Sequence, residues 1–239
     1  MARPTIIFDL DGTLIDTAPD LIDTLNLILG REGLPPVDYD QARALIGFGA
    51  RRMIERGLAL SARSAPASEI ERMFGDFIAH YTDHLADRSR PFPGLLAALD
   101  LLAARGCRFA VCTNKLERLS VRLLEALGLA GRFAAICGSD TFGVQKPDAG
   151  AVLGTLRKAG GNVSRTIMVG DSQTDIAAAK AARIPIVAVD FGYTEIPVRE
   201  LAPDKVISHF DDLPEAVAAL LNPATERASH REDTPLPCP

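Results

Sequence analysis

Two aspartates stand one residue apart near the start of the chain. The segment TIIFDLDGTLIDT (residues 5–17) places Asp9 directly after the apolar run TIIF and Asp11 two positions later. Side chains at i and i+2 of an extended segment point the same way, so both carboxylates leave the run on one side. Without a partner, each anion raises the pKa of the other. A divalent cation such as Mg²⁺, which takes carboxylate and substrate phosphate oxygens, resolves this repulsion and indicates phosphate chemistry.

Further polar side chains follow other apolar runs. A hydroxyl and an amide come after one run, a lysine precedes a proline in a later loop, and two acids come after another run. These residues are Thr113 and Asn114 in VCTNK, Lys146 in VQKPD, and Asp171 and Asp175 in VGDSQTD. Because α/β proteins bind ligands at the carboxyl ends of parallel strands, we expect these side chains to meet. This set of groups favours phosphoryl transfer through an aspartyl phosphate: it combines an acid pair, a hydroxyl, a lysine and further acids.

The elements that must position these residues alternate between short apolar runs and helical patterns. Unbroken, β-rich runs predict strands that are covered on both faces. They span residues 5–8, 107–112, 133–137, 165–170 and 185–190, with 204–208 as a sixth candidate. Between them, residues 115–129 give the clearest helical pattern, with Gly128 as a stop. This alternation predicts an α/β fold with a Rossmann-like parallel sheet.

One interval breaks the alternation. From about Asp16 to Arg90 only helical signals occur, beginning with Thr17 and Asp20 as a candidate capping box. We therefore expect a helical cap domain at 16–91, inserted between the two parts of a core domain, 1–15 and 92–222. The prolines of PFPG (91–94) would stiffen the return into the core. The polar, proline-rich segment 223–239 is predicted to be a disordered tail.

Composition excludes several other classes of protein. The 239 residues are 47% hydrophobic, which suffices for a sizeable core, and carry a net charge of −5 with scattered lysines and arginines. Nucleic acid is therefore not an expected partner. No apolar run spans a bilayer and no signal peptide is evident, so we expect a cytoplasmic protein without a membrane partner. The cysteines show no CxxC spacing, so neither disulfides nor zinc are expected; they are Cys107, Cys112, Cys137 and Cys238.

The quoted motifs resemble a known family. DLDGTLIDT, VCTNK, the lysine of QKPD and GDSQTD resemble the four ordered motifs of the haloacid dehalogenase-like (HAD) phosphatase superfamily, and they cover the chain to about residue 190. The helical insert resembles the cap domain of that superfamily. Within it, TAPDL, LIGFGARRMIERGL, TNK and FGY look closest to phosphoglycolate phosphatases.

The resemblance implies a role for each acidic residue. Asp9 would attack phosphorus and bind magnesium. Asp11 would protonate the leaving oxygen and then activate water, and its backbone carbonyl would help to hold Mg²⁺. Asp171 would be a further metal ligand. Asp175 would be an auxiliary acid near the metal, or would only stabilise the first turn of its helix.

The resemblance also implies how the phosphate is held. Thr113 and Asn114 would bind the phosphoryl oxygens, and Lys146 would neutralise charge on the nucleophile and the phosphate. Arg51 in the cap is a candidate partner for a substrate carboxylate, although an arginine on an amphipathic helix is often a surface residue. Taken singly, the hydroxyl and amide could instead cap a helix, the lysine could be solvated, and Asp11 with its glycine could form a turn.

These roles imply a magnesium-dependent phosphoric monoester hydrolase that acts on a small phosphorylated metabolite as a monomer or homodimer. 2-Phosphoglycolate is the best single candidate, with a place in carbohydrate metabolism. Sugar-phosphate phosphatase, pyrophosphatase and phosphomutase activities share the same motifs and stay open. A receiver-like phospho-switch and a non-catalytic binding protein are alternatives of a different class. A receiver differs in having no helical insert and in taking its phospho-acceptor from a later strand.

Overall fold

The buried run Thr5–Phe8 forms β1, the strand on which the sheet is built. The computed structural model describes residues 3–43, 45–47 and 49–222. Strand β1 pairs in parallel with β4 (Arg108–Cys112) on one side and with β6 (Thr166–Gly170) on the other. The remaining strands are β5 (Ala135–Cys137), β7 (Ile186–Val189) and β8 (Lys205–Ile207), and the order is β5-β4-β1-β6-β7-β8, parallel throughout. The predicted α/β fold class is confirmed.

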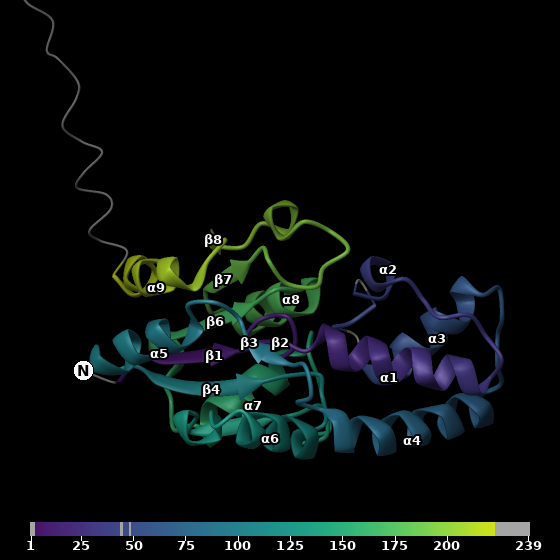
Figure 1. Cartoon of the computed structure of the whole chain (residues 1–239). Coiled ribbons are helices and arrows are strands. Elements are labelled where there is room, and N and C mark those ends of the chain that lie inside the picture. The colour runs from purple at the N-terminus through teal and green to yellow at the C-terminus, as the bar shows by residue number, and fades with distance from the viewer. Residues whose placement is uncertain (1–2, 44, 48, 223–239) are drawn as a thin grey trace, which may run out of the picture.

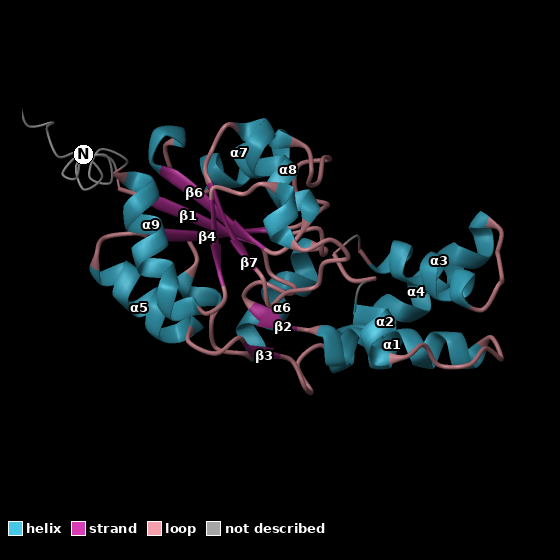
Figure 2. Cartoon of the chain, turned by 90° about the horizontal axis from the view of Figure 1, so that it is seen from above, coloured by secondary structure: helices cyan, strands magenta, loops and turns pink. Residues whose placement is uncertain are grey.

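Helices cover both faces of this sheet (Figure 2). They are α5 (Leu95–Ala104), α6 (Glu117–Ala126), α7 (Ala149–Lys158), α8 (Gln173–Ala182) and α9 (Leu213–Leu221). Short 3-10 turns span Ala130–Arg132, Val163–Arg165, Val198–Leu201 and Phe210–Asp212. Ile6 and Phe8 share one core with α5, α6 and α9, whereas Ile7 shares the other with α7 and α8. Successive strand side chains face opposite sides, so an unbroken apolar strand needs both layers.

The chain order around β1 creates the place for a site. From β1 the sheet grows through β4 and β5 toward one edge and through β6, β7 and β8 toward the other. The crevice outside the carboxyl ends of the strands at such a switch point is where open α/β sheets bind ligands. The loops after β1, β4 and β6 therefore lie side by side at this point.

Four helices lie together beyond the carboxyl ends of the strands (Figure 1). They are α1 (Ala18–Arg31), α2 (Tyr39–Arg43), α3 (Ala50–Leu60) and α4 (Ala67–His84). We call this group the cap, and the sheet with its covering helices the core. The chain enters the cap through β2 (Ile15–Asp16) and leaves it through β3 (Arg90–Pro91), and these two strands pair antiparallel. The domain limits at residues 16 and 91 stay a prediction.

The capping box predicted at the start of α1 is wrong. Thr17 makes no side-chain cap hydrogen bond. Its hydroxyl donates instead to Asp11 Oδ1 at 2.7 Å. The carboxylate of Asp20 accepts hydrogen bonds from the backbone N–H groups of Arg88 and Ser89 at 2.8–3.2 Å, which ties the start of the cap to its end. The capping-box pattern therefore predicts correctly where the helix begins, but it does not predict which groups the two side chains bind.

Three cysteines of the described residues are free and buried: Cys107, Cys112 and Cys137. The fourth, Cys238, and the tail predicted at 223–239 lie outside the described residues. Among the helices that are described, none is long and apolar enough to cross a membrane. The cytoplasmic location stays a prediction.

Candidate active site

The three central strands each bring one polar side chain to the same edge of the sheet. Asp9 follows β1, Thr113 follows β4 and Asp171 follows β6. The Asp9 N–H donates to the Val169 carbonyl at 2.9 Å, and the Thr113 N–H donates to the Cys137 carbonyl at 3.0 Å. These bonds continue the sheet register into the loops, so the backbone fixes where the side chains begin. All three side chains are buried.

Lys146 joins this edge from the loop before α7. Its ammonium lies 2.7 Å from Asp9 Oδ1 and 2.6 Å from Asp175 Oδ1, and its side chain is only 1% exposed. The solvated-lysine alternative is therefore wrong. Asp175 Oδ2 accepts the N–H groups of Asp171 and Ser172 and the Ser172 hydroxyl at 2.6–3.2 Å. Asp175 thus stabilises the first turn of α8, one of the two roles considered for it, and also holds the lysine. Its role near a metal stays a prediction.

Asp171 is fixed from two sides. Its Oδ1 accepts the hydroxyl of Thr13 and its Oδ2 accepts the backbone N–H of Tyr193, both at 2.7 Å. Two glycines leave room for this carboxylate. A Cβ on Gly12, which has φ +80°, would stand 2.5 Å from Asp171 Oδ2, and one on Gly192 would stand 2.2 Å from Asp171 Cβ. Larger residues at either position would displace the acid.

The charges at this edge do not balance. Asp9, Asp171 and Asp175 are buried around the single ammonium of Lys146. Burial raises the pKa of Asp9 to about 8, and repulsion from Asp175 adds to the rise. Burial and the same neighbour raise the pKa of Asp171 to about 7. With all carboxyls ionised, the cluster carries two surplus negative charges, which a divalent cation would offset.

The donor set also fits such a cation. One oxygen from each of Asp9, Asp171 and Asp175 lies within 4.8 Å of the others. Asp9 Oδ1 is buried and lies 2.7 Å from the Lys146 ammonium, which also donates to Asp175 Oδ1. A buried all-oxygen cluster with a surplus of negative charge is typical of a site for Mg²⁺ or a similar hard ion. The cluster can therefore hold a metal.

Asp11 lies apart from this cluster and faces other partners. Its carboxylate accepts the hydroxyl of Thr17 at 2.7 Å and the ammonium of Lys115 at 3.0 and 3.2 Å. Its side chain is 14% exposed, so it keeps some access to solvent or substrate. Sequence reasoning missed Lys115 as a site residue, although the segment VCTNK contains it. The signal was its position directly after two expected phosphate ligands.

The expected phosphate-binding side chains do not cap α6, because its N-cap is Leu116 and has no side-chain cap. Asn114 Nδ2 donates to the Lys146 carbonyl at 3.1 Å, and the Thr113 hydroxyl accepts the N–H of Lys115 at 3.2 Å. The capping alternative for these two residues is therefore wrong. Their contacts join the loop after β4 to the loop that carries the buried lysine.

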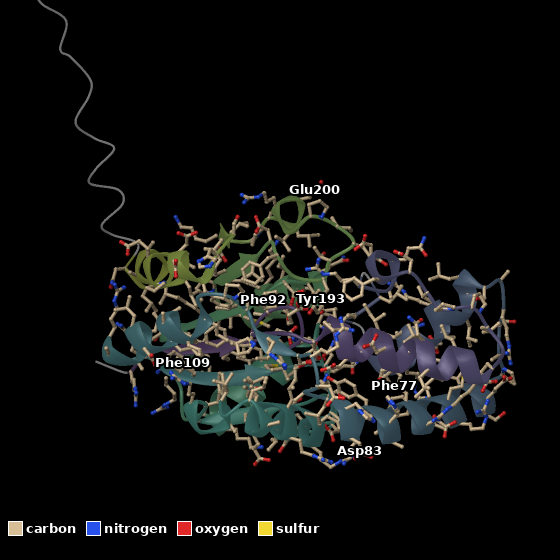
Figure 3. The ribbon with its side chains drawn as sticks, viewed as in Figure 1. Phe77, Asp83, Phe92, Phe109, Tyr193 and Glu200 are labelled. Carbon is tan, nitrogen blue, oxygen red and sulfur yellow. The ribbon has the colours of Figure 1, made fainter. Side chains whose placement is uncertain are left out.

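A cavity of about 330 Å³ lies between the cap and this edge of the sheet. Its core side includes Asp9, Asp11, Thr113, Asn114 and Lys115, and its cap side includes Gly49, Arg51, Phe74, Phe77 and Tyr81. Phe77 lies on the cap side of the molecule and Tyr193 nearer the sheet (Figure 3). The size suits a small ligand. Arg51 lines the wall, but its guanidinium is paired with Glu71 at 2.5 Å and is 45% exposed.

A switch-point sheet, a helical cap and a buried acid–lysine cluster beneath a small cavity define a phosphoryl-transfer hydrolase of the α/β class. The comparison with protein families agrees with this class. The chain belongs to the haloacid dehalogenase-like hydrolase family, whose model matches residues 6–189.

Curated relatives cover nearly the whole chain. The chain is 54% identical over 213 residues to a phosphoglycolate phosphatase of Mesorhizobium japonicum, covering 89% of this chain and 94% of that protein. It is 51% identical to a phosphoglycolate phosphatase of Agrobacterium fabrum, covering 90% and 92%. A crystal structure of a predicted phosphoglycolate phosphatase from Haemophilus somnus matches with a TM-score of 0.83 and 29% identity, over 90% and 97% of the two chains. The chain is therefore a phosphoric monoester hydrolase, and the receiver-like and non-catalytic alternatives are set aside.

Proposed function

We propose that this enzyme hydrolyses 2-phosphoglycolate to glycolate and inorganic phosphate through a phosphoryl group carried on Asp9. The observation that carries the proposal is the buried Asp9 carboxylate, paired with Lys146 at 2.7 Å on the wall of a small cavity. The names of the relatives above support the substrate. A cytoplasmic location, where small phosphorylated metabolites are found, belongs to the same proposal.

In the first step Asp9 attacks phosphorus, and the bond between phosphorus and the glycolate oxygen breaks. The carboxyl of Asp11 donates its proton to that oxygen, so glycolate leaves with a neutral hydroxyl. Lys146, held by Asp175, offsets the negative charge that Asp9 and the phosphoryl oxygens share. Thr113 and Asn114 line the cavity beside Asp9 and would position the phosphoryl oxygens.

In the second step water attacks the phosphorus of the aspartyl phosphate. Asp11, now a carboxylate, accepts a proton from that water, and the bond between Asp9 and phosphorus breaks. Inorganic phosphate leaves, Asp9 is a carboxylate again and Asp11 is ready to donate its proton. The Thr17 hydroxyl and Lys115 orient the side chain of Asp11 through both steps.

Asp9, Asp171 and the backbone carbonyl of Asp11 would hold Mg²⁺. Asp175 would not contact the ion but would accept a hydrogen bond from Lys146 and so position that lysine. When bound, the ion supplies Lewis-acid stabilisation of the phosphoryl charge. The cap side of the cavity would exclude bulk water from the reacting groups. Arg51, on that side, is proposed to attract an acidic substrate toward the site.

The test is a phosphate-release assay over a panel of small phosphate monoesters, with and without Mg²⁺. The panel contains 2-phosphoglycolate, glucose phosphates, pyrophosphate and a phosphomutase substrate. We expect 2-phosphoglycolate to be preferred, and Asp9→Asn to lower the rate at least about 10³-fold because it removes the nucleophile. Undiminished activity of Asp9→Asn would exclude this residue as nucleophile, and a preference for glucose phosphates would overturn the substrate.

A further inference from the structure

We infer that Lys115 and Tyr81 form the subsite for the carboxylate of the substrate, an inference that rests on the function proposed above. The Lys115 side chain is 7% exposed, and its ammonium lies 3.0 and 3.2 Å from the two Asp11 oxygens. It also lies 4.5 Å from the centre of the Tyr81 ring. Lys115 comes from the core and Tyr81 from α4 of the cap, and both line the cavity.

The hydroxyl of Tyr81 has no hydrogen-bond acceptor within the described part of the chain, although the residue is only 1% exposed. A buried hydroxyl without a partner is costly, so such groups are normally hydrogen-bonded. Burial raises the pKa of Tyr81 to about 12, which keeps the phenol protonated and able to donate. An unpaired donor beside a buried ammonium is suited to an anionic acceptor.

The covalent structure of the substrate places its carboxylate at this point. In 2-phosphoglycolate the carboxylate carbon is two bonds from the oxygen that leaves phosphorus. Asp11 must reach that leaving oxygen to protonate it, so the carboxylate has to lie within a few ångströms of Asp11 as well. Lys115 is the cation in hydrogen-bond contact with Asp11 among the described residues.

Arg51 is less suited to be the main contact. Its guanidinium is 45% exposed, is paired with Glu71 at 2.5 Å and lies 4.7 Å from the centre of the Phe74 ring. An exposed arginine that already has an anionic partner contributes attraction at a distance rather than a desolvated contact. The subsite therefore selects phosphate esters with a carboxylate one carbon from the ester oxygen, such as 2-phosphoglycolate and 2-phospholactate.

The closing experiment compares 2-phosphoglycolate with ethyl phosphate, in which a methyl group replaces the carboxylate and the reacting atoms are unchanged. Tyr81→Phe removes one hydroxyl from a buried ring. We expect it to lower kcat/KM for 2-phosphoglycolate about 10-fold and for ethyl phosphate less than about 2-fold, because a hydrogen bond to a charged group is lost only with the former. Tyr39→Phe, on an exposed tyrosine of α2, is the matched control and should change neither value.

Lys115→Gln also alters the surroundings of Asp11, so its effect is measured as the ratio of the two kcat/KM values. We expect this preference for 2-phosphoglycolate to fall about 100-fold, and Lys115→Arg to restore part of it. Glycolate, the product, should inhibit the wild-type enzyme and inhibit Tyr81→Phe at least about 5-fold more weakly. If Lys115→Gln fails to fold, Tyr81→Phe and the inhibition by glycolate decide the question.

The possible outcomes separate the subsite from the proposed function. Equal losses on both substrates in Tyr81→Phe, with an unchanged preference, would overturn the subsite while leaving the hydrolysis of 2-phosphoglycolate intact. If the wild-type enzyme hydrolyses ethyl phosphate and 2-phosphoglycolate with equal kcat/KM, the proposed substrate is overturned before any variant is compared. The same holds if it hydrolyses neither compound.

Discussion

Lys146 occupies a position that no other described cation shares, because it contacts two carboxylates at 2.7 and 2.6 Å with its side chain almost fully buried. Its pKa is raised by Asp175 and Asp9 despite the opposing effect of burial. In the proposed mechanism, an ammonium so held stays charged and offsets charge on Asp9 without exchanging its proton. We propose that Asp175 positions this lysine beside Asp9, the proposed nucleophile.

The raised pKa values at the cluster lead to a prediction on pH and metal. The pKa values of Asp9 and Asp171 in the folded state are raised to about 8 and about 7, far above the usual range of an aspartate carboxyl. Between the ordinary pKa of an aspartate and these raised values, the folded state thus binds more protons than the unfolded state. The free energy of unfolding therefore falls as pH rises through this range. In the metal-free protein, the free energy of unfolding should drop by on the order of 2 kcal/mol between pH 6 and pH 8.

In the proposed site Mg²⁺ would replace those protons, so its stabilising effect should be larger at pH 8 than at pH 6. Thermal unfolding at both pH values, with chelator or with Mg²⁺, measures this difference. Asp171→Asn is the control, because it removes one titrating carboxyl and should reduce both the pH dependence and the response to Mg²⁺. A shift in Tm by Mg²⁺ that is equal at the two pH values would contradict the account of the charges.

At this scale the sequence predicted the residues that follow strands, because a strand end fixes where Asp9, Thr113 and Asp171 must lie. It did not predict Lys115, since the contacts of that residue with Asp11 and Tyr81 join three segments that are distant in the chain. Periodicity and spacing carry no information on such contacts.

At the scale of elements, Tyr193 connects the loop after β7 to both the acidic cluster and the start of the cap. Its N–H donates to Asp171 at 2.7 Å, its hydroxyl donates to the Asp16 carboxylate, and the same oxygen accepts the N–H of Ala18 at 3.0 Å. The ring centre of Phe92, just after β3, lies 6.5 Å from the ring centre of Tyr193. Both residues are labelled in Figure 3. One residue therefore links the crossing segments of the cap, through its side chain, to a candidate metal ligand, through its backbone N–H.

Tyr193→Phe tests this link. The variant keeps the N–H that holds Asp171 but leaves Asp16 and the N–H of Ala18 without their partner. We expect the free energy of unfolding to fall by about 1–3 kcal/mol, because two polar groups lose a hydrogen bond, one of them buried and one partly buried. We also expect kcat to fall, since the cap is less firmly oriented over the cluster.

Urea unfolding and steady-state kinetics of Tyr193→Phe measure these two effects. Tyr39→Phe, which removes an exposed hydroxyl in the cap, should leave both quantities unchanged. Full activity together with unchanged stability in Tyr193→Phe would show that the hydroxyl does not couple the two parts.

The sequence predicted most of the core elements because their apolar runs must be buried on both faces. It did not predict the pairing of β2 with β3, since strands of two residues are too short for any periodic signal. The error at Thr17 and Asp20 has a related cause. Both side chains bind groups outside α1, and contacts of this kind override a local capping pattern.

At the scale of the whole molecule, the alternation of strands and helices predicted the fold class, and the long helical interval predicted a cap. The placement of the cap over the carboxyl ends of the strands depends on contacts that only the folded chain reveals. One of these is the ion pair between Arg56 of α3 and Glu195 of the loop after β7, at 2.5 Å. It spans the cap and the core at the surface.

This ion pair should affect cap position more than stability. Its side chains are 36% and 48% exposed, and exposed pairs contribute at most about 1 kcal/mol. We expect Glu195→Gln to change the free energy of unfolding by less than about 1 kcal/mol. Because it weakens a contact that joins the cap to the core, it should loosen the cap over the site and lower kcat/KM about 2–5-fold, which is within the free energy that an exposed ion pair contributes.

Glu55→Gln is the matched control, because Glu55 pairs with Arg52 within α3 at 2.9 Å and has a similarly exposed side chain. It removes the same charge without loosening any contact between cap and core, so kcat/KM should stay at the wild-type value. Steady-state kinetics at low and at high salt, together with urea unfolding, separate the two variants. High salt should reduce the difference in kcat/KM between the wild type and Glu195→Gln, because screening weakens an exposed ion pair. Equal kinetic effects of the two substitutions would indicate that overall charge, rather than the contact between cap and core, controls access to the site.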